Sequence, residues 1–255
     1  MGLAKLFRKE VMKVSFLIPL RGREHQVDSC LKNIDNYYSS YDYEVIFAYQ
    51  KDNFLFKRGQ LINLAAKKAK GDMFVIQDVD TRHLRKLDLY SNSHGFVGFN
   101  KREKVFDIGD GFVERTGKYV GRGVGALVIV PKQRFFDSFG FSNIYFGYGN
   151  EDYSFVRQRA KLSMLPGVLG HADHPITIGL KDIPPWRRIN LDYLKFERTQ
   201  HVDYSCDSVC HTIADELGSE KINEKVIIYY FSNIRVSKDF GRMEWYSKQV
   251  KLDKE

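Results

Sequence analysis

The sequence predicts an α/β protein with a mostly parallel central sheet. Apolar segments of strand length at residues 13–20, 43–49 and 72–77 alternate with amphipathic segments at 24–38 and 57–70. This strand–helix–strand–helix–strand order is typical of parallel strands joined by helical crossovers. The chain has 255 residues, of which 43% are hydrophobic and 28% charged, so it can bury a full core and is not a disordered chain.

Each element of the first half has a recognisable pattern. Residues 13–20 form a continuous apolar run, which favours a central strand buried on both faces. The segment 24–38 predicts a helix, because its apolar residues fall on one face at Val27, Leu31, Ile34 and Tyr38. The segment 57–70 predicts a second helix, which Gly71 ends.

The second half is less regular. Strands are predicted at 96–99, 126–130 and 225–231, helices at 131–139 and 150–161, and a polar helical stretch after Pro175. We therefore expect a core over residues 1–180 and a C-terminal elaboration over 181–255 packed on the same domain. A mobile flap and a packed connector remain equal interpretations of the segment that begins at Asp182.

Charge and cysteine content limit the classes of function. Forty Lys and Arg against 32 Asp and Glu give a formal charge of +8. The basic residues are scattered, so a solvated basic surface is favoured and a nucleic-acid partner is not expected. Polyanionic substrates such as nucleoside diphosphates, and weak attraction to an anionic membrane, stay open. No apolar run reaches the roughly 20 residues of a membrane span, and three cysteines predict a reducing, cytoplasmic location.

Two acidic motifs can carry chemistry. Asp78 and Asp80 directly follow the third predicted strand. Ligands of open parallel sheets bind at the C-terminal ends of the strands, and two carboxylates at such an end suit a hard divalent cation. The alternative is a pair of residues that cap a turn. Glu151 and Asp152 open a predicted helix after Phe146-Gly-Tyr148-Gly-Asn, whose aromatic rings could stack on a sugar. Plain helix capping is the alternative for these two acids.

Histidines and arginines complete the candidates. His171 and His174 are spaced to ligate one metal, or are two unrelated surface histidines. Arg21, Arg23 and Arg58 suit phosphate contacts, and Phe56 could stack on a base; the alternative is surface arginines and a core phenylalanine. Residues 121–125, a Gly-rich stretch, precede a strand instead of opening a helix, so they are not a dinucleotide fingerprint.

Taken in order, these segments resemble the β-1,4-galactosyltransferase family (glycosyltransferase family 7) and its chondroitin N-acetylgalactosaminyltransferase relatives. The matching segments are Pro19-Leu-Arg21-Gly-Arg23, Phe56-Lys-Arg58-Gly59, Asp78-Val-Asp80, Gly123-Val-Gly-Ala126, Phe146-Gly-Tyr148-Gly-Asn-Glu151-Asp152 and His171-Ala-Asp-His174. The family's Trp-Gly-Trp-Gly-Gly-Glu-Asp is altered here at Phe146, Tyr148 and Asn150. The resemblance covers about residues 13–175 and suggests a minimal, bacterial or viral, version of the catalytic domain.

The resemblance implies a GT-A fold, a nucleotide-sugar-binding sandwich, with Mn²⁺ or another divalent cation held by Asp80, His171 and His174. It implies that the donor is bound by Arg21, Arg23, Phe56, Arg58, Asp78 and Gly123. It assigns Asp152 as the general base and Glu151 beside it as a contact to the acceptor, with Phe146 and Tyr148 shaping the acceptor platform.

The activity expected from these assignments is an inverting glycosyltransferase of polysaccharide biosynthesis. Galactose or N-acetylgalactosamine would pass from a UDP-sugar to a saccharide hydroxyl. One base without a carboxylate nucleophile favours a single displacement, and the diphosphate leaving group needs no proton. The alternative is a non-catalytic carbohydrate- or nucleotide-binding module with the same fold.

Overall fold

The computed structural model describes residues 12–90, 94–97, 105–107, 112–115, 127–147, 149–165, 169–172, 185–237 and 244–254, and of residues 105–107, 112–115, 170–172, 186 and 254 only the backbone. The strands are β1 (Val14–Leu20), β2 (Tyr43–Gln50), β3 (Met73–Gln77), β4 (Thr81–His83), β5 (Gly95–Val97), β6 (Val105–Asp107), β7 (Phe112–Arg115), β8 (Leu127–Pro131), β9 (Ser163–Met164), β10 (Leu169–Ala172), β11 (Thr212–Lys221) and β12 (Val226–Val236). The helices are α1 (Val27–Tyr38), α2 (Arg58–Lys68), α3 (Lys132–Asp137), α4 (Glu151–Tyr153), α5 (Pro185–Thr199) and α6 (Glu244–Lys254). Short 3-10 helices lie at Glu24–Gln26, Tyr204–Asp207 and Val209–His211, and a π-helix at Ser154–Arg159.

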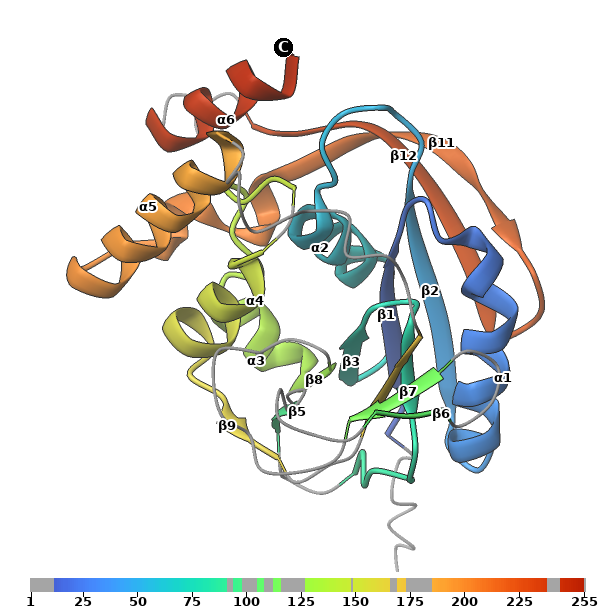
Figure 1. Cartoon of the computed structure of the whole chain (residues 1–255). Coiled ribbons are helices and arrows are strands. Elements are labelled where there is room, and N and C mark those ends of the chain that lie inside the picture. The colour runs from blue at the N-terminus through green and yellow to red at the C-terminus, as the bar shows by residue number, and fades with distance from the viewer. Residues whose placement is uncertain are drawn as a thin grey trace, which may run out of the picture.

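The central sheet has the strand order β11-β12-β2-β1-β3-β8-β5-β9 (Figure 1). Strands β12, β2, β1 and β3 run parallel to one another, and β8 pairs antiparallel with both β3 and β5. The predicted α/β class with a mostly parallel sheet is therefore confirmed. The antiparallel pairs at the two sides make the sheet mixed.

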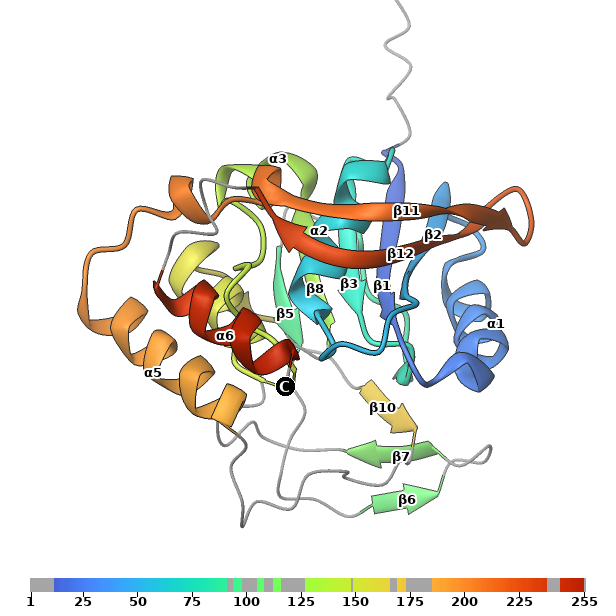
Figure 2. The same cartoon turned by 90° about the horizontal axis from the view of Figure 1, so that it is seen from above.

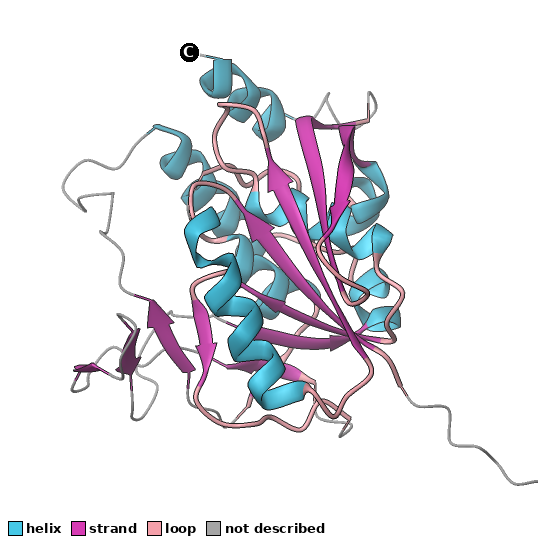
Figure 3. Cartoon of the chain, turned by 90° about the vertical axis from the view of Figure 1, so that its right-hand side faces the viewer, coloured by secondary structure: helices cyan, strands magenta, loops and turns pink. Residues whose placement is uncertain are grey.

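Helices cover both faces of this sheet (Figures 1 and 3). Strand β1 shows why the sequence has a continuous apolar run there: Phe16 and Ile18 pack in the core under α1, whereas Leu17 packs in the core under α2. Side chains of a strand alternate between faces, so a strand with helices on both sides needs apolar residues at every position.

The C-terminal segment is part of the sheet. Strand β12 pairs in parallel with β2. Strand β11, which precedes β12 in the chain, pairs antiparallel with it as a hairpin and forms the outer edge of the sheet. We did not predict β11 from the sequence, because its residues are mostly exposed and polar, and an edge strand lacks the buried-strand pattern. Helix α5 precedes this hairpin in the chain and α6 follows it, and the two helices pack against each other (Figure 1).

A second, smaller sheet has the order β4-β10-β7-β6 (Figure 2). Strand β4 begins directly after the turn that follows β3, so this sheet stands next to the C-terminal end of β3. Among the described residues, no helix combines the length and the apolar character that crossing a bilayer requires.

A buried ion pair ties α6 to the loop before α2. Lys57 Nζ lies 2.7 Å from Asp253 Oδ2, both side chains are 5% exposed, and Asp253 Oδ1 accepts a hydrogen bond of 2.6 Å from the Leu55 backbone N–H. Removing one member of such a pair leaves the other charge buried without its counter-ion, which costs about 3–5 kcal/mol.

We therefore expect Asp253→Asn to lower the midpoint of thermal unfolding by on the order of 10 °C. The control is Glu244→Gln on the same helix, which removes an exposed pair with Lys248 and should change the midpoint little. Equal midpoints for the two variants in a calorimetric scan would contradict the prediction.

Candidate active site

The turn after β3 places two carboxylates at the C-terminal end of a central strand. The Thr81 backbone N–H donates to the Asp78 carbonyl at 3.0 Å, which turns the chain into β4. Asp80 is fully buried and forms an ion pair with Arg23, whereas the Asp78 side chain is 35% exposed. Asp78 is thus the more accessible carboxylate.

Arg82 stabilises this turn through hydrogen bonds to its backbone. Its Nη1 donates to the carbonyls of Val79 at 2.6 Å and Thr81 at 3.0 Å, and its side chain is buried. The sequence predicted that the scattered basic residues lie on a solvated surface, and for Arg82 this expectation is wrong. Only its position two residues after Asp80 could have indicated a role in this turn.

A glycine-rich turn carries the second acidic pair. Gly147, Gly149 and Asn150 have φ angles of 70°, 99° and 82°, in the left-handed region. Glycine adopts this region freely, and asparagine tolerates it better than most residues. The left-handed conformation at this position explains why asparagine is tolerated at Asn150, where the pattern of the resembled family has a glycine. Glu151 and Asp152 then begin α4, which continues as the π-helix.

Arg58 joins the two acidic motifs. At the start of α2 its guanidinium is buried, with Nε 2.6 Å from Asp78 Oδ1 and Nη1 3.5 Å from Glu151 Oε1. Nη1 also contacts Asp152 Oδ1. The sequence assigned Arg58 to the diphosphate, whereas here one guanidinium holds three carboxylates from separate segments of the chain.

Burial controls the protonation of this group. It raises the pKa of Asp152 well above its ordinary value, although the Arg58 charge opposes the rise. The pKa of Glu151 is raised for the same reason. Burial alone would lower the pKa of Arg58, but the three carboxylates outweigh it and raise that pKa. A carboxyl with a raised pKa is a stronger base than an ordinary aspartate.

The predicted ligand set of Asp80, His171 and His174 would suit a divalent cation. Strand β10 pairs with β4 so that the His171 backbone lies opposite Thr81, one residue from Asp80. A buried carboxylate with imidazoles is a ligand set that Mn²⁺ accepts. The His171 side chain and all of His174 lie outside the described residues, and within the described part no three His, Cys, Asp or Glu side chains already form a metal cluster.

The remaining predicted site residues occupy different environments. Arg21 donates to the Phe54 carbonyl, and Phe56 packs partly buried against the core under α2. Phe146 is 1% exposed and its ring packs against Tyr246, so its face cannot receive a sugar in this structure, and the predicted stacking role is corrected. Gly123 and Tyr148 lie outside the described residues.

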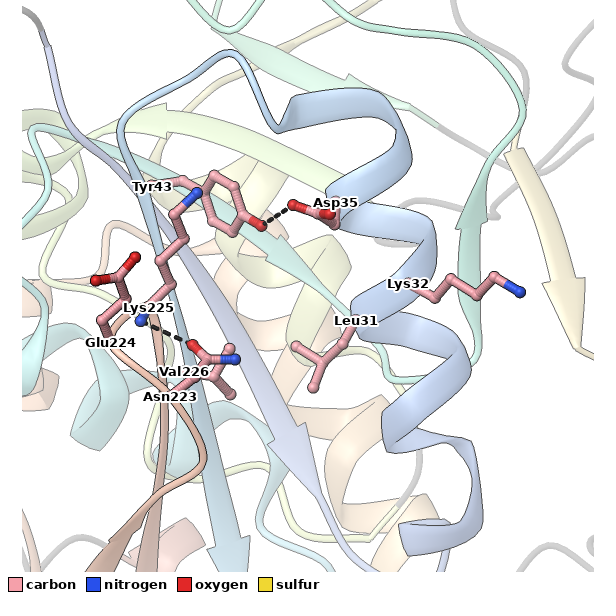
Figure 4. A pocket seen from close by; sticks show the side chains of 8 residues that line it. All are labelled: Leu31, Lys32, Asp35, Tyr43, Asn223, Glu224, Lys225 and Val226. Atoms are coloured by element: carbon pink, nitrogen blue, oxygen red, sulfur yellow. Dashed lines mark hydrogen bonds between the residues drawn. The ribbon is translucent and has the colours of Figure 1, made fainter.

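A surface hollow elsewhere does not belong to this site. It lies between α1 and the β11–β12 hairpin, and the residues around it include Asp35, Tyr43 and Lys225 (Figure 4). Tyr43 begins β2 and Val226 begins β12, so the hollow is at the N-terminal ends of these strands. The carboxylates lie at the opposite, C-terminal ends.

Comparison with known proteins finds relatives over part of the chain. No family model matches the chain. It is 32% identical over 154 residues to β-1,4-galactosyltransferase 4 of Cricetulus griseus, a match that covers 56% of this chain and 41% of that protein. It is 30% identical over 167 residues to the Homo sapiens β-1,4-galactosyltransferase 4, covering 62% and 45%. Over this part of its length, the chain is therefore similar to β-1,4-galactosyltransferases.

Solved structures show the same fold. The catalytic domain of Drosophila β-1,4-galactosyltransferase 7 in complex with xylobiose superposes with a TM-score of 0.64 at 19% identity, over 92% of this chain and 99% of that one. A mutant of that enzyme in complex with manganese, UDP-Gal and xylobiose gives 0.65. The expected GT-A fold is therefore confirmed. The matches of the chain span less than half the length of the curated relatives.

Proposed function

We propose that this protein is a metal-dependent galactosyltransferase that moves galactose from UDP-galactose to a saccharide hydroxyl with inversion. The observation that carries the proposal is the Arg58 cluster, which gathers Asp78, Glu151 and Asp152 beside Asp80. Homologous proteins are β-1,4-galactosyltransferases, and a structural neighbour was solved with manganese, UDP-Gal and xylobiose.

Asp152 is the group suited to accept the proton of the acceptor hydroxyl. Its side chain is 23% exposed, whereas that of Glu151 is 6% exposed, so a substrate reaches Asp152 more easily. Arg58 fixes the Asp152 carboxylate from one side and leaves the exposed side to the acceptor. General-base assistance of this kind contributes roughly 10²–10⁴ in rate.

Asp80, His171 and His174 would hold Mn²⁺, with Arg23 beside Asp80. The bound cation would neutralise the charge that develops on the leaving diphosphate. The site has more acidic than basic side chains: the carboxyl groups of Asp78, Asp80, Glu151 and Asp152 face only the guanidinium groups of Arg23 and Arg58. Such an excess of carboxyl groups favours the binding of a cation.

A single displacement fits the described residues best. Asp152 serves as the base, and Arg58 engages the neighbouring carboxylates Asp78 and Glu151 in ion pairs. Direct attack by the acceptor hydroxyl on the donor sugar inverts the anomeric carbon.

The test measures UDP release from UDP-galactose with a saccharide panel that includes xylobiose. We expect turnover with Mn²⁺, none after chelation with EDTA, and a shift of half-maximal Mn²⁺ to at least tenfold higher concentration in Asp80→Asn. The control is Asp88→Asn, an exposed aspartate of the same region, which should need no more Mn²⁺ than the wild type.

Three outcomes decide between the alternatives. Faster turnover of UDP-N-acetylgalactosamine than of UDP-galactose would overturn the galactose assignment. Binding of UDP without release from any donor would favour the non-catalytic module. Full turnover in EDTA would remove the metal from the proposal.

A further inference from the structure

Helix α5 contacts both ends of the turn that carries the acidic pair. In its described residues, 145–147 and 149–154, this turn contains three left-handed backbone positions and begins only a short helix. Glycine-rich backbone of this kind has many accessible conformations, so its geometry must be fixed by contacts from outside. One such contact is the hydrogen bond of 2.8 Å from the Gly147 backbone N–H to the Phe56 carbonyl. Two side chains of α5, Asn190 and Glu197, supply further ones.

Glu197 holds the two flanks of the turn together. Its Oε2 accepts a hydrogen bond of 2.6 Å from the Tyr145 hydroxyl, and its Oε1 accepts one of 2.9 Å from the Ser154 hydroxyl. All three side chains are buried. Ser154 is two residues from Asp152, so this carboxylate fixes the helix start on which the proposed base stands.

Asn190 holds the middle of the same turn. Its Nδ2 donates to the carbonyls of Phe146 at 2.8 Å and Gly149 at 3.3 Å, and the side chain is fully buried. Its Oδ1 accepts from Gln249 of α6. Asn190 and Glu197 are seven residues apart, two helical turns, and so lie on one face of α5.

A buried arginine keeps Glu197 in place. Arg159 Nε lies 3.7 Å from Glu197 Oε1, and the same guanidinium contacts Asp207. Burial raises the pKa of Glu197, and the Arg159 charge opposes that rise. Asp207 also accepts hydrogen bonds from the Ser142 hydroxyl at 2.5 Å and the Asn143 backbone N–H at 2.8 Å, and both of these residues precede the turn.

We infer that Glu197 and Asn190 are positioning residues that set the placement of Asp152 against the acceptor. The inference rests on the proposed function, because it assigns Asp152 as the base. A displacement of about 1 Å of a reacting group can cost on the order of 10² in rate. Substrate binding, which uses other side chains, should change little.

The experiment compares Glu197→Gln with Asp207→Asn. Both variants remove one buried carboxylate charge from Arg159, so both should lose stability, and Asp207→Asn should lose at least as much because Asp207 has more partners. Glu197 contacts the turn itself, whereas Asp207 contacts residues before it, and we expect Glu197→Gln to lower kcat for UDP release by roughly 10–100-fold. The KM for UDP-galactose should stay within about threefold, because a misplaced base impairs the reacting geometry and not donor binding. Asp207→Asn should keep kcat near the wild-type value at a temperature where both are folded.

Ser154→Ala provides a second route if Glu197→Gln does not fold. It removes one hydrogen bond to the turn and leaves the ion pair between Glu197 and Arg159, so we expect it to fold as the wild type does. A lower kcat in Ser154→Ala would support the inference by itself. Where Glu197→Gln folds, a less than additive loss in the double variant would support it as well.

Two results would overturn it. Equal kcat loss in Glu197→Gln and Asp207→Asn, with an active wild type, would show a purely structural role and leave the proposed function standing. A wild type that releases no UDP from any donor would overturn the proposed function and the positioning role together.

Discussion

Replacing Asp152 by Asn is expected to lower kcat for UDP release by about 10²–10⁴. The amide keeps the size of the carboxylate and can still accept the Arg58 hydrogen bond, but it cannot take a proton from the acceptor hydroxyl. The measurement is steady-state UDP release with saturating UDP-galactose, Mn²⁺ and acceptor. Asp152 is half-buried at a helix start, and the variant should therefore remain folded.

The pH dependence separates a lost base from a distorted site. Because the pKa of Asp152 is raised by burial, the wild-type rate should fall as the pH decreases through a value above the ordinary range of aspartate. In Asp152→Asn this limb should disappear from the profile. A variant that retains both the wild-type rate and the wild-type acid limb would remove Asp152 from the role of base.

The elements that follow local patterns could be predicted from the sequence. Strand β1 was predicted from its unbroken apolar run, and α1 from the spacing of Val27, Leu31 and Ile34, because burial on two faces or on one dictates those patterns. The exposed edge strand β11 has no such requirement, so its sequence is ambiguous. The π-helix at Ser154–Arg159 was predicted as ordinary helix, since the same residue types suit both.

The site was predictable as a set of residues but not as a set of contacts. Asp78, Asp80 and Asp152 were identified from motifs whose place at strand and helix ends follows from local sequence. The pairing of Arg58 with three carboxylates depends on the tertiary fold, and no spacing rule links residues 58 and 152. Glu197 and Asn190 were missed for the same reason: each is a common polar residue within a helix of ordinary composition.

The cytoplasmic location and the weak attraction to anionic membranes stay predictions. They depend on the cysteine count and the formal charge of +8, which describe the chain as a whole. The fold modifies the second of these arguments. Arg58, Arg82 and Arg159 are buried with oxygen partners, so part of the basic content serves the interior and not the surface.

Two substitutions of Arg58 separate the effect of its positive charge from the effect of its planar guanidinium shape. Arg58→Lys should lower kcat by on the order of 10²-fold, because an ammonium is a point charge that cannot hold Asp78 and Asp152 in the geometry of a planar fork. Arg58→Met should lower kcat at least as far and also cost about 3 kcal/mol of stability. This cost is at the low end for a buried group, because Asp78 and Asp152 are partly exposed to solvent.

The acid limb of the rate profile supplies the independent measurement. The Arg58 charge lowers the pKa of Asp152, so its removal in Arg58→Met should move the limb to higher pH, whereas Arg58→Lys should move it less. The control is Arg85→Met. Arg85 is an exposed arginine two residues after β4, and its replacement should change neither the rate nor the pH profile. If Arg58→Met lost activity without any movement of the limb, Arg58 would act on the donor and not on the base, as the sequence had first suggested.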